Sequence, residues 1–289
     1  MDKLIGNSFD KDTKYKLYRN VIEIVHPTIS KNNISSYRVV FKDNLFPVRV
    51  FYPKKISQLD SIIIYIHGDG FITNCFNNYS KICTELAQET KNIVIAIDYE
   101  ENNQLYPKLL QKLNETVNYL YQELEEQNFT SDKIVLMGDS IGATLCLGIS
   151  NLNKNKIDRQ ILFYPAVSGE YFGRTQYESI IRSKDYDNLT IPRLSMYLER
   201  MLKNKKDLNN GNIVPLKNKE FTSYPKTLII IGNTDPLLDE NKELYEKLQK
   251  ADNKGEFLEL EFAGHGFLGS MDFETKNIVI EKINDFLKK

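Results

Sequence analysis

The stretch Lys133-Ile-Val-Leu-Met137 runs directly into Gly138-Asp-Ser-Ile-Gly142, and this junction decides which fold the chain can adopt. An apolar run of strand length leads into G-x-S-x-G, and residues Ala143 to Ser150 then have the character of a helix. A strand that turns so sharply into a helix needs small residues two before and two after Ser140, where the backbone crosses itself. The turn would hold the hydroxyl near a helix N-terminus, which favours negative charge. The pattern predicts a nucleophilic serine.

Three further stretches supply what such a serine requires. His67-Gly-Asp-Gly-Phe71 follows the apolar run at residues 61–66, and a glycine-containing loop there can turn backbone N–H groups toward an oxyanion. Asp235 comes just after the apolar run that begins at Leu228, and His265 lies between two glycines after the alternating run Phe257–Phe262. Histidine can take and return the serine proton, and a carboxylate fixes its tautomer. Taken alone, each stretch is also compatible with an ordinary turn, and for the Asp and the His the turn is the more frequent case.

These segments resemble the hormone-sensitive-lipase-like branch of the α/β-hydrolases, of the microbial carboxylesterase and acetyl esterase type. The resemblance covers about residues 35–289. It rests on six segments: His67–Phe71, Gly138–Gly142, Asp235-Pro-Leu-Leu-Asp239, His265-Gly-Phe267, Phe163-Tyr-Pro165 and Val214-Pro-Leu216. It implies a catalytic triad of Ser140, Asp235 and His265. It also implies oxyanion donors from the backbone N–H groups of Asp69, Gly70 and Ile141.

The chain departs from the family pattern at three places. Asp69 stands where a third glycine is usual, and we expect its carboxylate to point away from the oxyanion because it would repel that charge. The stretch Tyr99–Gln104 replaces the family's Tyr-Arg-Leu-Ala-Pro-Glu, and Asn74 replaces a common glycine. None of these changes removes a catalytic group, so they suggest a divergent member with an unusual substrate.

Alternation of strand-like and helix-like runs predicts the α/β-hydrolase fold, with a mostly parallel eight-stranded sheet, helices on both faces and a helical cap. Expected strands are residues 35–41, 47–52, 61–66, 92–98, 133–137, 160–164, 227–231 and 256–262, the first two forming an antiparallel pair at the edge. Expected helices are residues 79–89, 109–126, 140–151, 240–251 and 272–287. Each candidate catalytic residue lies at the carboxyl end of a strand, where sites form in such sheets.

The domain organisation follows from the same reading. Residues 34–289 form the catalytic domain, and by resemblance residues 1–33 and 166–222 form cap segments over the active site. The first segment includes a helical spacing at 14–25, and Pro192–Leu202 is an amphipathic helix whose apolar stripe is also compatible with simple packing on the core. Phe71, Tyr79 and Phe267 are candidates for the substrate pocket, although each is equally compatible with core packing.

Composition excludes several classes of function. The 289 residues carry a formal net charge of −1 without a basic patch, which argues against nucleic acid as a partner. The start lacks the apolar segment of a signal peptide, and no run is apolar over the length of a membrane span. The three cysteines (Cys75, Cys83 and Cys146) have no metal-like spacing. We expect a cytoplasmic protein with no metal, no organic cofactor and no membrane partner.

The leading hypothesis is a serine carboxylic-ester hydrolase that acts on small, short-acyl esters through an acyl-enzyme. Two alternatives remain open at this point. The same triad could serve an amidase or peptidase, because both reactions pass through the same oxyanion. A non-catalytic relative could instead bind a small molecule, an idea that Asp69 supports. A homodimer is compatible with the sequence, although no residue indicates one.

Overall fold

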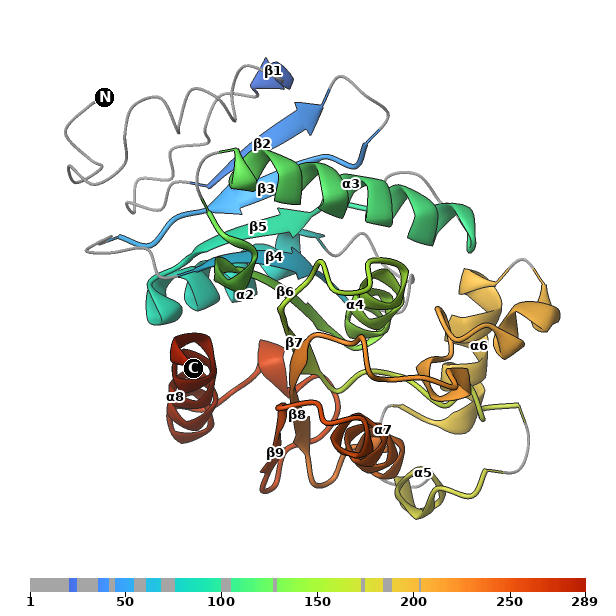
Figure 1. Ribbon diagram of the computed structural model, residues 1–289. Coiled ribbons are helices and arrows are strands. Elements are labelled where there is room, and N and C mark those ends of the chain that lie inside the picture. Colours follow the sequence, from blue (N-terminus) through green and yellow to red (C-terminus); the bar gives the residue numbers. More distant parts are fainter. Residues whose placement is uncertain are drawn as a thin grey trace.

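A computed structural model of the protein describes residues 21–24, 36–41, 45–54, 61–68, 76–99, 105–126, 129–172, 175–183, 189–202 and 204–289. Within these residues a single twisted sheet runs through the molecule in the order β1-β2-β3-β5-β4-β6-β7-β8-β9 (Figure 1). Pairing is antiparallel from β1 to β5 and parallel from β5 through β4 to β9. The predicted α/β-hydrolase arrangement is confirmed.

Apart from β1, the strands begin and end close to where the sequence places them. Their bounds are β1 Val21–Ile24, β2 Ser36–Phe41, β3 Val48–Phe51, β4 Ile62–Ile66, β5 Ile93–Ile97, β6 Ile134–Asp139, β7 Arg159–Phe163, β8 Lys226–Gly232 and β9 Glu256–Leu260. Every residue of β4, β5 and β6 is buried, as expected for central parallel strands made mostly of apolar residues.

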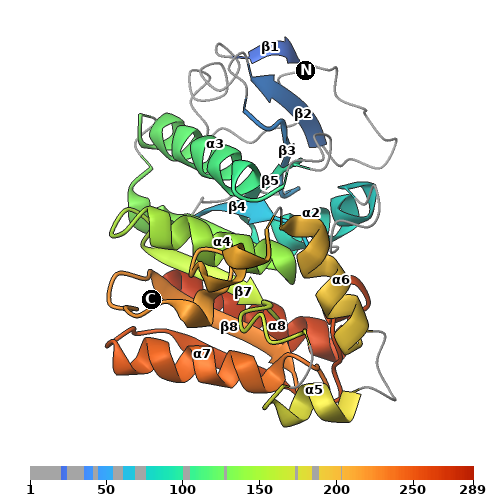
Figure 2. The ribbon, with the colours of Figure 1, turned by 90° about the vertical axis from the view of Figure 1, so that its right-hand side faces the viewer.

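Two layers of helices cover the sheet (Figures 1 and 2). Helices α3 (Lys108–Glu125), α4 (Ile141–Leu152) and α7 (Leu238–Lys250) lie on one face, and α2 (Phe76–Thr90) and α8 (Phe273–Lys288) lie on the other. Each of these helices matches one expected from the sequence to within three residues at either end. Helix α4 is buried over most of its length between the sheet and α3, which suits its apolar, small-residue composition.

The sequence prediction is wrong at one segment near the N-terminus. Helical spacing was expected over residues 14–25, but Val21–Ile24 form strand β1, which pairs antiparallel with β2 and adds a ninth strand. Three of the four residues in the short segment Val-Ile-Glu-Ile are β-branched, so strand pairing with β2 outweighs the weak helical periodicity. The expected antiparallel pair β2–β3 is present, but β1 and not β2 is the outer strand.

The segment between β7 and β8 contributes two further helices, α5 (Glu178–Ser183) and α6 (Ile191–Met201). Both lie toward the right-hand side of Figures 1 and 2, where α5 packs beside α7 and α6 lies above it. In α6 the residues Leu194, Leu198 and Met201 are buried, so the apolar stripe noted in the sequence packs on the protein. Most of the other expected cap segment, residues 1–33, lies outside the described residues, so the division into catalytic domain and cap stays a prediction.

Candidate active site

The serine of the G-x-S-x-G motif occupies the sharp turn between β6 and α4. Ser140 has φ 50° and ψ −124°, a conformation that residues with a side chain seldom adopt. Its backbone N–H donates to the carbonyl of Phe163 at the end of β7, at 2.9 Å, and its own carbonyl accepts from the N–H of Thr144. The strained residue is therefore held between the neighbouring strand and its own helix.

The two glycines of the motif are required by close backbone approach. A Cβ on Gly142 would lie 2.2 Å from the carbonyl oxygen of Ile66 and 2.3 Å from that of His67. A Cβ on Gly138 would lie 2.7 Å from the Ile66 oxygen and 2.8 Å from the backbone of Gly142. Because these neighbours are backbone atoms at the end of β4 and in the first turn of α4, they cannot move aside as a flexible side chain could. Only glycine lets the turn pass directly over the end of β4.

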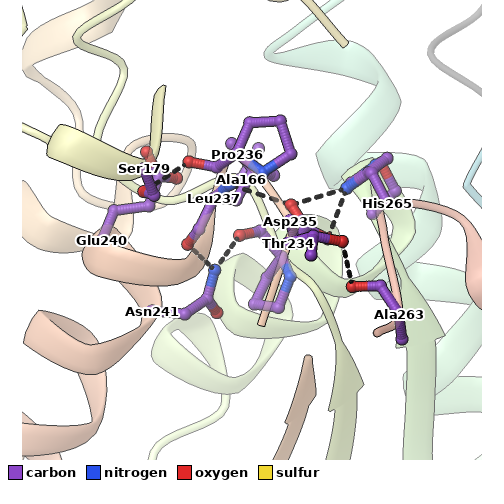
Figure 3. A network of polar contacts seen from close by, with 12 residues as sticks. Ala166, Ser179, Thr234, Asp235, Pro236, Leu237, Glu240, Asn241, Ala263 and His265 are labelled. Carbon is purple, nitrogen blue, oxygen red and sulfur yellow. Dashed lines mark hydrogen bonds and ion pairs between the residues drawn. The ribbon is translucent and has the colours of Figure 1, made fainter. Parts of the chain in front are cut away.

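The other two predicted residues meet Ser140 in one chain of polar contacts. The Oγ of Ser140 lies 3.0 Å from Nε2 of His265, and Nδ1 of the same ring lies 3.0 Å from Oδ2 and 3.2 Å from Oδ1 of Asp235 (Figure 3 shows the His265–Asp235 pair). The Asp235 side chain is fully buried, whereas that of His265 is 13% exposed. A hydroxyl that donates, an imidazole that accepts at one nitrogen and donates at the other, and a carboxylate that accepts can in this order move a proton off the hydroxyl.

Backbone and hydroxyl groups fix Asp235 and His265 relative to each other. The carboxylate of Asp235 also accepts from the N–H of Leu237 at 2.8 Å, while its own N–H donates to the Gly232 carbonyl. The hydroxyl of Thr234 donates to the Ala263 carbonyl at 2.7 Å, which ties the loop before Asp235 to the loop before His265 (Figure 3). Both loops follow adjacent parallel strands, β8 and β9, so sheet register sets their distance.

A second buried carboxylate, Asp139, lies beside the serine and was not singled out from the sequence. Its Oδ1 accepts from the hydroxyl of Tyr65 at 2.6 Å and the N–H of Gly68 at 2.9 Å, and its Oδ2 accepts from the hydroxyl of Tyr79 at 2.8 Å. Burial raises the pKa of the Asp139 carboxyl to about 6, against the lowering effect of these hydrogen bonds. The Gly68 contact joins the end of β4 to the nucleophile turn.

The first histidine of the glycine loop is a structural residue. His67 is buried, its ring stacks on Tyr99 with centroids 4.3 Å apart, and the Tyr99 hydroxyl donates to the His67 carbonyl at 2.7 Å. Burial lowers the pKa of His67 to about 4, so the ring is neutral near pH 7 and does not act as the base. Tyr99 is thus the part of the divergent Tyr99–Gln104 stretch that the structure shows supporting the site.

The predicted oxyanion donors are described only in part. Ile141 is the first residue of α4, and the leading N–H groups of a helix have no acceptor within it, so this donor is free of the helical ladder. Asp69 and Gly70 lie outside the described residues, as does Phe71 of the predicted pocket. Their roles, and the orientation of the Asp69 carboxylate, stay predictions.

The two other pocket candidates are buried side chains. Tyr79 is 9% exposed and binds Asp139, while Phe267 is 6% exposed and packs edge to face against Phe163 and Tyr164. Both are therefore core residues beside the site, and their contact with a substrate stays a prediction. The sequence analysis did not predict that Tyr65 and Tyr164 would lie at the site. The one feature that could have indicated them is a tyrosine inside an otherwise apolar strand or directly after one.

A buried glutamate on α7 anchors the segment that leaves β7. Both oxygens of Glu240 accept hydrogen bonds: Oε1 from the N–H of Val167 (2.6 Å) and the hydroxyl of Tyr171 (2.6 Å), Oε2 from the hydroxyl of Ser168 (2.6 Å). Burial raises the pKa of Glu240 to about 7. The adjacent Asn241 donates to the carbonyls of Pro165 and Leu237, so the helix that follows Asp235 also secures the chain beyond β7 (Figure 3).

Other kinds of site find no support among the described residues. There, no group of three or more His, Cys, Asp or Glu side chains is arranged to hold a metal ion. Cys83 and Cys146 are buried thiols, and burial raises the pKa of both. None of the helices in the described part of the chain has the length and apolarity needed to cross a membrane.

Comparison with known proteins gives a consistent result. A family model described as alpha/beta hydrolase fold matches residues 63–269. An acetyl esterase of Salmonella schwarzengrund is 28% identical over 223 residues, which are 76% of this chain and 68% of that protein. The structure of the Francisella virulence factor BioJ is similar with a TM-score of 0.78 and 25% identity, covering 96% of this chain and 88% of that one. Carboxyl esterase 2 of Tuber melanosporum, at 20% identity and TM-score 0.77 over 90% and 88% of the two chains, shares the fold.

Proposed function

The chain belongs to the alpha/beta hydrolase fold family, and from this premise we propose that it is a serine carboxylic-ester hydrolase acting on small, short-acyl esters. The observation that carries the proposal is the contact chain from Ser140 Oγ through the His265 ring to the buried Asp235 carboxylate. The likeness to an acetyl esterase supports the ester as substrate and the acetyl group as a suitable acyl size.

The proposed reaction proceeds in two halves. Nε2 of His265 takes the proton of Ser140 as Oγ attacks the ester carbonyl, and the carbonyl oxygen becomes an oxyanion facing the N–H of Ile141 and those of the glycine loop. The tetrahedral intermediate collapses, the alkoxide leaves with the proton from His265, and an acyl-serine remains. Water then loses a proton to His265, attacks the acyl carbon and releases the acid, which restores the Ser140 hydroxyl.

Asp235 serves this cycle without changing its own charge. Its carboxylate accepts from Nδ1 of His265, so Nε2 faces Ser140 without a proton in the resting state. When the ring becomes an imidazolium, the buried negative charge stabilises it. The site residues need no metal or organic cofactor for any of these steps.

The first test is chemical labelling combined with substitution of the nucleophile. We expect a fluorophosphonate to label Ser140 in the folded protein and p-nitrophenyl acetate to be hydrolysed, with Ser140→Ala losing activity by a factor on the order of 10⁶. The thermal unfolding of the variant controls for folding. Residual activity within about tenfold of the wild type would contradict the assignment, and absence of labelling would favour the non-catalytic binding protein.

The amidase or peptidase alternative is separated by the leaving group. Turnover of p-nitrophenyl acetate is compared with that of the matching anilide, and a preference for the anilide would overturn the ester assignment. A series from acetyl to octanoyl esters then tests the short-acyl preference.

The buried, unpaired thiols Cys83 and Cys146 are compatible with a reducing compartment, so we place the enzyme in the cytoplasm. Pairing of two copies is tested by light scattering.

A further inference from the structure

Tyr164 has an unfavourable backbone conformation directly beside the candidate active site. Its φ is 39°, which is unusual for any residue other than glycine and costly for one with a bulky side chain. It follows the last residue of β7, just as Ser140 follows the last residue of β6. Two neighbouring strands thus end in strained residues, and the function of the strain at Tyr164 is not explained by the triad alone.

The conformation of Tyr164 is held from both sides. Its N–H donates to the carbonyl of Ile230 on β8 at 2.9 Å. Beyond it, the Pro165 carbonyl accepts from Asn241 at 2.8 Å, the Ala166 carbonyl accepts from the hydroxyl of Thr144 at 2.7 Å, and the Val167 N–H donates to Glu240. These partners come from α4 and α7, the helices that begin just after Ser140 and just after Asp235. A strained residue persists only where its surroundings determine it in this way.

The side chain that this backbone positions contacts the histidine. The ring centroids of Tyr164 and His265 are 4.7 Å apart with an interplanar angle of 60°, an edge-to-face pair. Phe267 packs on the same ring from another side at 5.1 Å and 76°. The phenol is 2% exposed, and burial together with the charges of Asp139 and Asp235 raises its pKa well above the usual value, so the ring is neutral.

We propose that Tyr164 is a positioning residue for His265, holding the imidazole edge to face between Ser140 and Asp235 and stabilising its protonated form through the π electrons of the phenol ring. The role rests on the proposed function, in which the imidazolium forms in each half of the cycle. A cation over the face of an aromatic ring, within about 6 Å of its centroid, is attracted to the π electrons, and the attraction is stronger where water is excluded. In this pair we take the edge of the His265 imidazole to point at the face of the phenol ring.

Among the described residues, Asp235, Ser140 and Asp139 also act on the imidazole and set the background for this effect. Asp235 bonds to Nδ1, Ser140 bonds to Nε2, and the buried carboxylate of Asp139 is close enough for its charge to interact with that of His265. Both carboxylates favour the imidazolium whatever residue stands at position 164. A change confined to the aromatic ring therefore isolates the contribution of Tyr164.

The decisive measurement is an NMR titration of His265, which is practicable because the chain has three histidines. We compare the wild type with Tyr164→Phe, Tyr164→Leu and a series carrying one to three fluorine atoms on a phenylalanine at position 164. Fluorine withdraws π electrons with little change of shape, so the protein should stay folded. The titration midpoint of His265 should be the same in Tyr164→Phe as in the wild type and should fall with each fluorine atom added. It should be lowest in Tyr164→Leu, about 0.4–1.5 pH units below the wild type.

Kinetics on the same variants tests positioning. Tyr164→Leu should lower kcat by about 10- to 100-fold with KM nearly unchanged, because the base is displaced, and Tyr164→Phe should restore both values. Phe286→Leu is the control for loss of a buried ring, since Phe286 on α8 is fully buried and lies beside Lys226 at the amino end of β8, the end opposite to the site. It should lower thermal stability and leave the His265 midpoint in place.

Two results would overturn the inference: a His265 midpoint that does not follow fluorination, or a Tyr164→Phe variant as impaired as Tyr164→Leu, which would assign the effect to the hydroxyl. The NMR readout does not require turnover. If the wild type proves unable to hydrolyse esters, the proposed function fails while the ring effect is still measured.

Discussion

Replacing Asp139 by asparagine should change how stability depends on pH, because the carboxylate is buried beside three donors. An asparagine can keep all of these contacts. Its oxygen can accept from Tyr65 and Gly68 as Oδ1 does now, and its amide can donate to the Tyr79 oxygen once that phenol rotates its proton away. The substitution therefore removes the titration of this site with little change of shape.

The size of the effect follows from the pKa of Asp139. Burial raises that pKa from 3.8 to about 6, so the native state binds the proton more tightly than the unfolded state does. The stability from this site is present in full below pH 3.8 and is lost as the pH rises through about 6. Between about pH 4.5 and about pH 7.5 the wild type should lose about 2 kcal/mol relative to Asp139→Asn, since one pKa unit corresponds to about 1.4 kcal/mol.

The assay is thermal unfolding of both proteins across this range, followed by circular dichroism. A loss of about 2 kcal/mol corresponds to a change of about 4–8 °C in the difference between the two Tm values, because about 2–4 °C accompanies each kcal/mol in proteins of roughly this size. All other titrating groups are shared, so they cancel in the difference. A Tm difference that stays constant with pH would refute the raised pKa and, with it, the view that burial outweighs the three hydrogen bonds.

The other predictions concern the glycine of the nucleophile turn and the buried carboxylate of α7. Gly142→Ala places a Cβ 2.2 Å from the Ile66 oxygen, so we expect esterase activity to fall on the order of 100-fold and the free energy of unfolding to fall by about 1–3 kcal/mol. Gly269→Ala is the control, because a Cβ there meets nothing within 4 Å, and it should change neither quantity by a comparable amount. Equal behaviour of the two variants in p-nitrophenyl acetate turnover would show that the elbow tolerates the methyl group. Glu240→Gln should gain stability relative to the wild type as the pH rises from about 5 to about 8, because burial raises the pKa of Glu240 to about 7 and the native state loses stability as that proton leaves. Chemical unfolding at both ends of the range measures this gain, and a difference independent of pH would contradict it.

The elements that the sequence located correctly are those whose pattern is local. β4 and β6 are continuous apolar runs, and the helix after Ser140 follows a motif in which each glycine has a local steric reason. The triad candidates could be found because each lies just after such a run, and parallel strands bring their ends together at one edge. The conformation of Val21–Ile24 was predicted wrongly because it depends on pairing with β2, and a local sequence pattern carries no information about that pairing.

The supporting groups escaped prediction because they depend on contacts between distant strands and helices. Asp139 stands within the serine motif, yet nothing in the sequence shows that Tyr65 on β4 and Tyr79 on α2 would surround it. Glu240 is five residues beyond Asp235 and reads as the exposed acid of a helix start, but it is fully buried by the segment after β7. The positive φ of Tyr164 could not be predicted, because tyrosine is not a residue type that favours this conformation.

The strand ladder itself accounts for how these groups reach a common geometry. At the ends of β6, β7 and β8, the chain continues one hydrogen bond beyond each strand: Ser140 N–H to Phe163, Tyr164 N–H to Ile230, and Asn233 N–H to Leu260. The nucleophile, the aromatic ring and the loop that carries the acid are thereby attached in series to the same backbone network, and the loop after β9 supplies the histidine. Because each link is an inter-strand hydrogen bond and not a flexible side chain, a displacement at one strand end is passed to its neighbours. Substitutions that shift β7 should therefore impair catalysis even where they leave Ser140, Asp235 and His265 unchanged.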